Sequence, residues 1–354
     1  MEMPLVSVIV PMYNTASYVG DLIESCRTQT LGEFELIIVD DCSTDNSCEV
    51  VESHIPKLGG RLKLIRTFRN EGPGVKRNWG LELSRGKYIF FADSDDLLTQ
   101  KSLEQFYGLA EKYQTDVINC RRHYYTEGTG ENFVKNLKLY GDPKDTRTEI
   151  VLDDTAKRLR AWTRHAFEME PWTKFCRRDF LIENDIKFLP TAQEDSVWTF
   201  ELICVAKKML MIPNICYIRR VREDSLASVS LKREMNVRSV RNKMDRIVRG
   251  FRYIDEFMDR VEFFRENPDE RYKAMRHLLT QNVNWIRISA TETGTSPRVV
   301  YENLREAFKN DTGEFEALIP FLLSNNVRLV KELIEERQKI RELTKKLGTN
   351  TGAE

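Results

Sequence analysis

The first 120 residues alternate strand-like runs with segments of helical period, and this alternation constrains the fold more than any other feature. Runs typical of strands lie at 6–10, 34–39, 63–68, 88–92 and 116–120. Between them, apolar residues recur every three or four positions near 19–26, 50–55, 75–84 and 103–113, which predicts helices. Strands that alternate with helices form a mostly parallel sheet with helices on both faces. The N-terminal part of the chain is therefore predicted to be a Rossmann-like α/β domain.

The apolar run from Tyr88 to Ala92 ends at Asp93-Ser94-Asp95-Asp96, which puts three carboxylates within four residues. In an extended chain, Asp93 and Asp95 point to the same side. Two unit charges about 5 Å apart repel by roughly 3 kcal/mol at an effective dielectric of about 20. Either these carboxylates are solvated on a turn, or a hard divalent cation lies between them.

Two other polar clusters follow predicted strands, Pro11-Met12-Tyr13-Asn14 and Asp40-Asp41. Each cluster alone is explained by a turn, because Asp and Asn favour turns. Together they indicate a nucleotide site, since ligands bind beyond the carboxyl ends of the strands in such sheets. The chain has neither G-x-x-x-x-G-K-[ST] nor G-x-G-x-x-G, so a metal at Asp95 is expected to hold the phosphates in place of a glycine loop.

Composition excludes several classes of protein. The 354 residues carry a formal net charge of zero, which argues against a general nucleic-acid binder. Seven cysteines without a C-x-x-C pair are typical of reduced thiols, and four scattered histidines suggest no zinc site. We find no signal peptide and no apolar run of membrane-spanning length, so a cytoplasmic protein is expected.

Four segments resemble the successive motifs of family 2 glycosyltransferases: VSVIVPMYN, ELIIVDDCSTDNS, NEGPGVKRNWGLELSRGKYIFFADSDD and PTAQEDSVW. The resemblance covers roughly the first 225 residues. It implies a GT-A fold, a nucleotide-activated sugar donor, inversion at the anomeric carbon and a role of the bacterial polysaccharide type. The expected cofactor is Mn²⁺ or Mg²⁺, a Lewis acid for the departing diphosphate.

The resemblance also implies roles for individual residues in the donor site. Asp41 would hydrogen-bond the nucleotide base, Asp93 would bind ribose or metal, and Asp95 would ligate the metal. The further residues expected at the nucleotide sugar are Pro11, Tyr13, Asn14, Arg77 and Ser94. Because the Asp41 carboxylate only accepts hydrogen bonds, a base N–H such as that of uracil suits it, and a UDP-sugar is favoured.

Near the donor site, Lys76 is interpreted as a solvated helix residue, whereas the family pattern favours Arg77 and the neighbouring Asn78 as site residues. Cys42 stands where the family often has glycine, which leaves the turn after Asp41 open.

The later motifs implied by the resemblance concern the acceptor and catalysis. Asp195 matches the second acid of the family's E-D motif, the general base, with Glu194 on the acceptor side; acids that merely favour a helix start are the alternative. A base held ionised by a helix start would be a weak one. Trp172 would wall the acceptor sugar, with core packing as an equal alternative. Arg220 and Arg222, in an expected loop, would chelate donor phosphates.

The remaining segments are less specific. Residues 1–228 are predicted to be the catalytic domain, 229–347 a mainly helical domain and 348–354 a disordered tail. Residues 121–148 are interpreted as a polar excursion near the site. The basic stretch 219–252 suits docking at the inner face of the membrane or a solvated helix face. Leu333, Ile340 and Leu347 are spaced for pairing in a homodimer, or for packing within the chain.

The predicted activity is transfer of a hexosyl or N-acetylhexosaminyl group to a glycan or lipid-linked acceptor. Two alternatives belong to other classes. A phosphotransferase with an aspartyl nucleophile typically has D-x-D-x-T after its first strand, whereas this D-x-D follows a later one. A catalytically silent sugar-nucleotide-binding or scaffolding protein of the same fold is the other alternative.

Overall fold

The computed structural model describes residues 3–127, 137–140, 150–190, 194–221, 249–251 and 253–292, without the side chains of 279 and 282–292. The chain divides into two units, one of residues 1–225 with 252–268 and the other of residues 226–251 with 269–354. The first unit holds all of the sheet and the candidate site. The described part of the second unit is mainly α11 (Pro268–Glu292). No helix in the described ranges is both long enough and apolar enough to cross a membrane.

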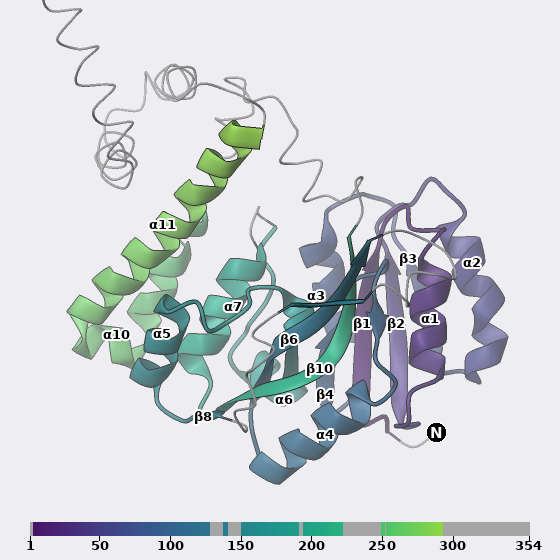
Figure 1. Cartoon of the computed structure of the whole chain (residues 1–354), viewed down its shortest axis with the longest axis horizontal. Helices are drawn as coiled ribbons and strands as arrows, with labels where there is room; N and C mark the ends of the chain where they lie inside the picture. The colour runs from purple at the N-terminus through teal and green to yellow at the C-terminus, as the bar shows by residue number, and fades with distance from the viewer. Residues whose placement is uncertain are drawn as a thin grey trace, which may run out of the picture. The chain divides into compact units, whose positions relative to one another are not determined.

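Ten strands in the described residues form one mixed sheet (Figure 1). Eight of them run in the order β3 (Leu62–Arg66), β2 (Phe34–Asp40), β1 (Val6–Met12), β4 (Tyr88–Phe91), β9 (Lys174–Arg177), β6 (Val117–Glu127), β10 (Met209–Val221) and β5 (Leu97–Leu98). In addition, β7 (Lys138–Tyr140) pairs with β6, and β8 (Ile150–Leu152) pairs with β10.

The sheet is parallel from β3 to β4, as the strand–helix alternation predicts. β9 then enters antiparallel between β4 and β6, and β6 and β10 are again parallel to each other. In register, Val8 of β1 lies between Leu36 of β2 and Phe90 of β4. The carboxyl ends of these three strands therefore meet at one edge of the sheet.

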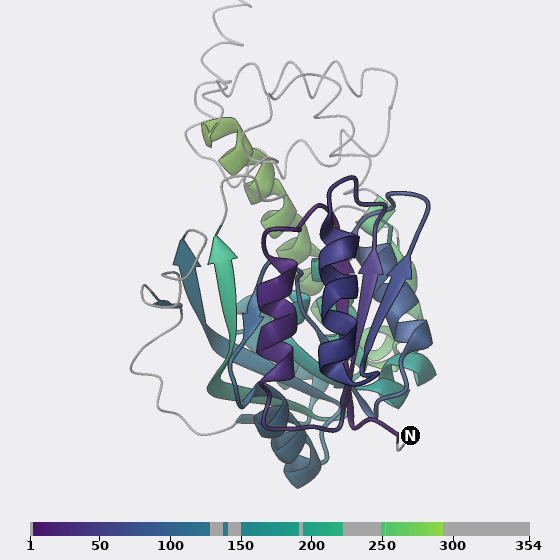
Figure 2. The ribbon, with the colours of Figure 1, turned by 90° about the vertical axis from the view of Figure 1, so that its right-hand side faces the viewer.

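Helices cover both faces of the sheet. The helices described in the first unit include α1 (Val19–Arg27), α2 (Ser47–His54), α3 (Pro73–Leu83), α4 (Ser102–Tyr113), α5 (Thr155–Thr163), α6 (Arg178–Glu183), α7 (Glu194–Val205) and α10 (Glu262–Glu266), with short 3₁₀ turns at Ile55–Leu58 and Pro171–Thr173. In Figure 2, α1 in dark purple and α2 in blue-violet lie side by side in front of the parallel strands.

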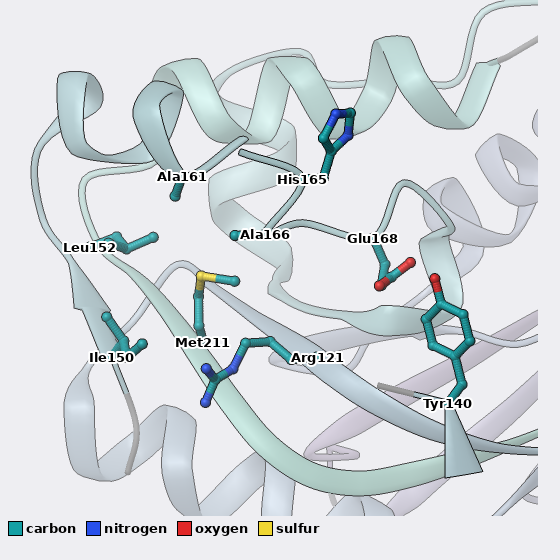
Figure 3. A pocket seen from close by; sticks show the side chains of 9 residues that line it. All are labelled: Arg121, Tyr140, Ile150, Leu152, Ala161, His165, Ala166, Glu168 and Met211. Atoms are coloured by element: carbon teal, nitrogen blue, oxygen red, sulfur yellow. The ribbon is translucent and has the colours of Figure 1, made fainter. Parts of the chain in front are cut away.

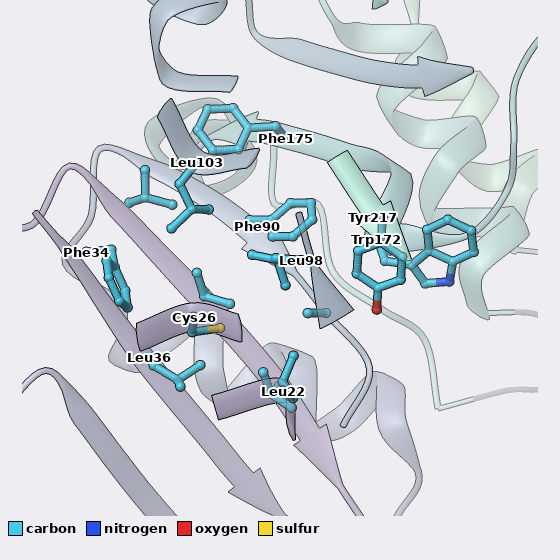
Figure 4. Close-up of a cluster of buried hydrophobic side chains, with 14 of the residues drawn as sticks. Leu22, Cys26, Phe34, Leu36, Phe90, Leu98, Leu103, Trp172, Phe175 and Tyr217 are labelled. Atoms are coloured by element: carbon cyan, nitrogen blue, oxygen red, sulfur yellow. The ribbon is translucent and has the colours of Figure 1, made fainter. Parts of the chain in front are cut away.

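Alternation along β1 decides which side chain meets which helix. Val8 and its neighbour Phe90 belong to the apolar cluster of Figure 4, together with Leu22 and Cys26 of α1. Ile9 points to the opposite face, where a Cβ on Gly80 of α3 would lie 2.2 Å from the Ile9 Cγ2 atom. The glycine therefore lets α3 approach the sheet closely at Ile9.

Two regions differ from the sequence-based expectations. The predicted polar excursion at 121–148 begins as ordered strand, because β6 continues to Glu127 beside β10. The expected loop of the later arginines is also strand up to Val221, since β10 runs for 13 residues. Polar side chains are compatible with both strands because the hydrogen bonds between strands are made by backbone groups alone. Residues 128–136 and 141–149 lie outside the described part of the chain.

We expect Gly86→Ala to destabilise the protein by about 3 kcal/mol, the upper end of the usual overpacking range. A Cβ there would lie 2.5 Å from the backbone nitrogen of Ser7 and 2.7 Å from the carbonyl carbon of Val6, so strand β1 itself must move. Gly108→Ala in α4 is the matched control, because its Cβ meets nothing within 4 Å. The control should stabilise by about 0.5–1 kcal/mol. Equal denaturation midpoints for the two variants would contradict this packing.

Candidate active site

The loops that follow β1 and β2 are locked together at the carboxyl edge of the sheet. Asn14 has a φ of 50°, and its side-chain oxygen accepts a 2.8 Å hydrogen bond from the backbone N–H of Thr44. The Asn14 N–H in turn donates to the Ser43 hydroxyl at 3.0 Å. Pro11 is buried, whereas Tyr13 is 45% exposed. Tyr13 is therefore exposed at the carboxyl edge of the sheet.

Asp41 holds the loop that precedes α3. Its two carboxylate oxygens accept hydrogen bonds from the backbone N–H groups of Glu71 and Gly72, at 2.8 and 2.9 Å. Lys76 Nζ lies 3.2 Å from Asp41 and 2.8 Å from the Glu71 carboxylate. The interpretation of Lys76 as a solvated residue is therefore wrong, because its side chain is fully buried in an ion pair. The residue after Asp41, Cys42, has a φ of 64°, a conformation that glycine adopts without strain.

The Asp93–Asp96 segment is a turn rather than a continuation of β4. The Asp96 N–H donates to the Asp93 carbonyl at 3.2 Å, so the strand-like alternation expected of Asp93 and Asp95 does not apply. The turn is held to β10 at two points. The Asp93 N–H donates to the Tyr217 hydroxyl at 2.9 Å, and the buried Asp96 accepts from the Arg220 N–H at 2.7 Å. Ser94 is also buried, at 5% exposure.

Electrostatics in this turn fit a divalent cation. Burial raises the pKa of Asp96 well above its ordinary value, and the charges of Asp95 and Asp93 raise it further. Asp93 and Asp95 are both partly exposed and add negative charge at one point. In the described ranges no three His, Cys, Asp or Glu side chains are grouped to hold a metal by themselves. Two carboxylates fit a Mg²⁺-type site in which substrate phosphates complete the coordination.

Arg77 joins this turn to the first residues of α7. Its guanidinium lies 2.9 Å from Asp93 through Nη2 and 3.1 Å from Asp195 through Nη1, with Glu194 at 3.6 Å. The Arg77 side chain is 5% exposed, and it lies over the Phe188 ring at 5.2 Å. Burial lowers the pKa of Arg77, but the three carboxylates together raise it, so the guanidinium stays charged.

Asp195 has a shifted pKa that suits a base. Burial raises the pKa of Asp195 to about 8; the charge of Arg77 opposes this rise, and Glu194, Asp93 and Glu170 add to it. The side chain keeps 34% exposure, so a ligand can reach it. This direction is opposite to the one expected for a base that a helix start holds ionised. A pKa near working pH is the one that favours proton transfer.

The two helices that carry Arg77 and Asp195 are fixed to each other. Asn78 clamps the segment before α7: its amide donates to the Phe188 carbonyl at 2.8 Å and accepts from the Phe188 N–H at 2.9 Å. A Cβ on Gly74 would lie 3.0 Å from Glu194 Cγ, so the N-termini of α3 and α7 approach closely. Arg77 thus contacts the carboxylates, and Asn78 fixes the segment before α7. The sequence predicted neither contact.

The structure places two other predicted residues as follows. Trp172 is 4% exposed and stacks on Tyr217 at 4.6 Å, which favours core packing over a wall for the acceptor sugar. Arg220 is 3% exposed and pairs with Asp21 of α1 at 2.9 Å rather than projecting from a loop. Arg222 and the rest of the basic stretch to residue 248 lie outside the described residues, as do residues 293–354, which include Leu333, Ile340 and Leu347.

Sequence reasoning missed two buried polar groups beside the site. Lys174 is fully buried, and its ammonium donates to the carbonyls of Glu168 and Glu170 and, at 2.8 Å, to the Thr173 hydroxyl. The Tyr217 hydroxyl supports the carboxylate turn as described above. The available signal was the position of Lys174 between Trp172 and Phe175, because a lysine among apolar residues needs buried partners.

Known proteins resemble this chain in sequence and in fold. Residues 7–183, half of the chain, match the model of glycosyl transferase family 2. The uncharacterized glycosyltransferase EpsJ of Bacillus subtilis is 29% identical over 243 residues, which are 66% of this chain and 66% of EpsJ. The putative glycosyltransferase EpsH of the same species is 30% identical over 64% of this chain and 63% of EpsH. The alignments thus span just under two thirds of these relatives.

Solved structures share the fold. The Staphylococcus aureus TarS 1–349 complex with UDP-GlcNAc superposes with a TM-score of 0.53 at 24% identity, covering 86% of this chain and 90% of that one. The mannosyltransferase PcManGT of Pyrobaculum calidifontis, in complex with GDP-Man and Mn²⁺, gives 0.52 at 17% identity, covering 93% and 88%. These likenesses confirm the GT-A fold predicted from the sequence. With the family model matching half of its residues, the chain belongs to glycosyl transferase family 2.

Proposed function

We propose that this protein transfers a sugar, with inversion, from a nucleotide-diphosphate sugar to a hydroxyl of a glycan or lipid-linked acceptor in surface polysaccharide or glycoconjugate biosynthesis. The observation that carries the proposal is the bridge through Arg77. It brings the carboxylate turn at Asp93 and the base candidate Asp195 within reach of one guanidinium, although they are far apart in sequence. Sugar transfer with inversion is a single displacement at the anomeric carbon, and it requires a donor-binding group and a base close together.

The donor is proposed to lie over the carboxyl ends of β1, β2 and β4. Tyr13 would contact the face of the base, and Asp41 would accept its N–H beside the loop that it already holds. Asn14, Pro11 and Ser94 would shape this edge through the loops they fix. Two solved neighbours of this fold carry UDP-GlcNAc and GDP-Man, so the fold itself admits either base.

Chemistry at the reacting carbon needs a base on one side and a stabilised leaving group on the other. Asp195 would accept the proton of the acceptor hydroxyl as the new glycosidic bond forms. Arg77 would hold the Asp195 carboxylate in place and offset negative charge near Asp93. A divalent cation held by Asp93 and Asp95 would supply Lewis-acid stabilisation of the departing diphosphate when bound.

The test of this function is release of nucleoside diphosphate from a panel of sugar nucleotides by the purified chain, with Mn²⁺ or Mg²⁺ and candidate glycan acceptors. We expect slow hydrolysis without acceptor and faster release with one. Binding of sugar nucleotides without any turnover would instead support the catalytically silent alternative. Absence of both binding and turnover would overturn the proposal.

For the base, we expect UDP to compete with the sugar nucleotide better than GDP or dTDP, because Asp41 offers only acceptor oxygens to a pyrimidine N–H. Displacement of a fluorescent nucleotide measures the three affinities under one condition. Preference for GDP would overturn the choice of UDP-sugar but leave the glycosyltransferase proposal in place.

For the metal, Asp95→Asn is expected to keep the fold but to abolish the gain in UDP affinity that Mn²⁺ gives the parent. Calorimetric titration of UDP with and without Mn²⁺ measures this gain independently of activity. Asp45→Asn, on the neighbouring β2 loop, is the matched control and should keep the gain, because its carboxylate accepts hydrogen bonds from Ser47 and Ala16. A metal-enhanced affinity in Asp95→Asn equal to the parent's would remove Asp95 from the ligand set.

A further inference from the structure

A pocket of about 350 Å³ lies beside strands β6 and β10 (Figure 3). It is bounded by β6, β7, β8, β10 and α5, and none of its lining residues belongs to the donor site described above. Sites for small molecules usually measure about 300–1,000 Å³, so this one suits a single sugar-sized group rather than a long chain.

The two ends of the pocket differ in chemistry. At one end Ile150, Leu152 and Ala161 form an apolar wall, and Met211 reaches the middle of the space (Figure 3). β8 and β10 hold this wall in place, since Met211 pairs with Ile150 in the sheet. An apolar surface of this kind contacts methyl or methylene groups and offers nothing to a bare hydroxyl.

At the other end, Tyr140 and Glu168 point toward each other, whereas the Arg121 side chain extends away from them and places its guanidinium below Met211, on the side of Ile150 (Figure 3). Tyr140 is supported from behind by the His123 ring, stacked at 4.6 Å. Burial, together with the charge of Glu170, raises the pKa of Glu168 to about 7. Near neutral pH the carboxyl group can therefore either donate or accept a hydrogen bond, as sugar hydroxyls require.

The polar end is connected to the catalytic helix. The segment 168–170 is held by the buried Lys174, and the Thr199 hydroxyl of α7 donates to the Met169 carbonyl at 2.8 Å. Glu170 is near enough to Asp195 for its charge to raise the pKa of that residue. A ligand at Glu168 therefore lies beside a segment that is hydrogen-bonded to α7, the helix of Asp195.

We propose that this pocket binds one sugar unit of the acceptor, with its hydroxyls at Tyr140 and Glu168 and an apolar substituent against Ile150 and Leu152. The inference rests on the proposed function and names the substrate class of its acceptor side, a saccharide that carries an acyl or alkyl group. The acyl group of an amino sugar and the alkyl group of a lipid-linked sugar share this chemistry, so the experiment separates them.

The test uses saturation-transfer NMR on the full chain with three probes: N-acetylglucosamine, glucose and octyl β-glucoside. We expect one of the two substituted sugars to bind, and glucose to bind at least tenfold more weakly. Binding of the acetylated sugar alone would identify an amino-sugar acceptor, and binding of the octyl glucoside alone a lipid-linked one. Glucose binding as tightly as both substituted sugars would overturn the assignment of the apolar wall.

Two substitutions on α5 locate the binding. Ala161→Leu fills the apolar end and should weaken binding of the substituted sugar at least tenfold. Ala156→Leu adds the same bulk to the same helix outside the pocket lining and should leave binding unchanged. Glu168→Gln, which keeps the shape, should weaken every sugar probe. Unchanged binding in Ala161→Leu, or no binding of any probe to the parent, would overturn the proposal.

UDP affinity with Mn²⁺, measured on the same preparations, separates this inference from the proposed function. We expect parent-like UDP affinity in all three variants, because none of the replaced residues touches the donor edge. Pocket-dependent sugar binding without any nucleotide affinity would refute the transferase and leave a saccharide site. Nucleotide binding and turnover that Ala161→Leu leaves unaltered would refute the pocket alone.

Discussion

Replacing Asp195 with Asn should lower sugar transfer by roughly 10²- to 10⁴-fold, the usual range for a lost general base. The amide keeps the size of the side chain but cannot take the proton of the acceptor hydroxyl. Donor affinity should be nearly unchanged, because the proposed donor contacts belong to Asp41, Asp93 and Asp95. Transfer rate and UDP affinity, measured on one preparation, check both halves of this expectation.

Glu194→Gln is the matched control, since Glu194 opens the same helix and lies near the same guanidinium. It should reduce transfer far less. If Asp195 served only the helix start, its loss would cost about 0.3–1 kcal/mol of stability and leave turnover intact. A fully active Asp195→Asn enzyme with a slightly lower melting temperature would therefore contradict the assignment of Asp195 as the base.

The raised pKa of Asp195 also predicts the pH dependence of transfer. Because its carboxyl group loses its proton near pH 8 in the folded protein, transfer should rise with pH and level off above about 8. The contribution of Asp195 to stability changes with pH in the opposite direction to transfer. A folded pKa above the ordinary 3.8 means that the contribution of Asp195 to the free energy of unfolding is present below about pH 4 and is lost as the pH rises through about 8. A transfer profile that is flat between pH 6 and 9 would contradict this assignment.

The second large effect is expected for Arg77→Met, which should lower the free energy of unfolding by about 3 kcal/mol and abolish most transfer. Removing one partner of a buried ion pair usually costs about 3–5 kcal/mol. The lower end applies because about a third of the Asp93 and Asp195 side chains faces solvent. Urea denaturation at pH 7 measures the loss.

Two further variants show whether the loss comes from the carboxylates. Arg77→Lys keeps the charge but cannot reach Asp93 and Asp195 with two separate nitrogens, so it should recover part of the stability and little of the activity. Adding Asp93→Asn to Arg77→Met removes one uncompensated carboxylate and should make the double variant more stable than Arg77→Met alone. Strictly additive losses would show that Arg77 does not bridge these acids.

Local sequence patterns predicted the parts of the site that lie within single segments. The apolar run before Asp93 is β4, the acid pair at Glu194 opens α7, and the glycine-like position at Cys42 has a positive φ. Each of these depends on neighbouring residues, whose spacing and backbone preferences are visible in the chain itself. The order of strands and helices likewise followed from period alone and indicated the shared strand edge.

The sequence by itself thus determined the α/β class, the family motifs and the edge at which the site forms, whereas the tertiary structure decided the partner of every charged group there. Arg77 meets Asp195 across 118 residues, and Lys76 is buried against Asp41, so neither contact has a local signal. For the same reason, the sequence did not decide that Trp172 packs in the core or predict that Arg220 pairs with Asp21. The contacts of a charged or aromatic side chain depend on residues that are distant in sequence. Only the packing of the sheet brings those residues together.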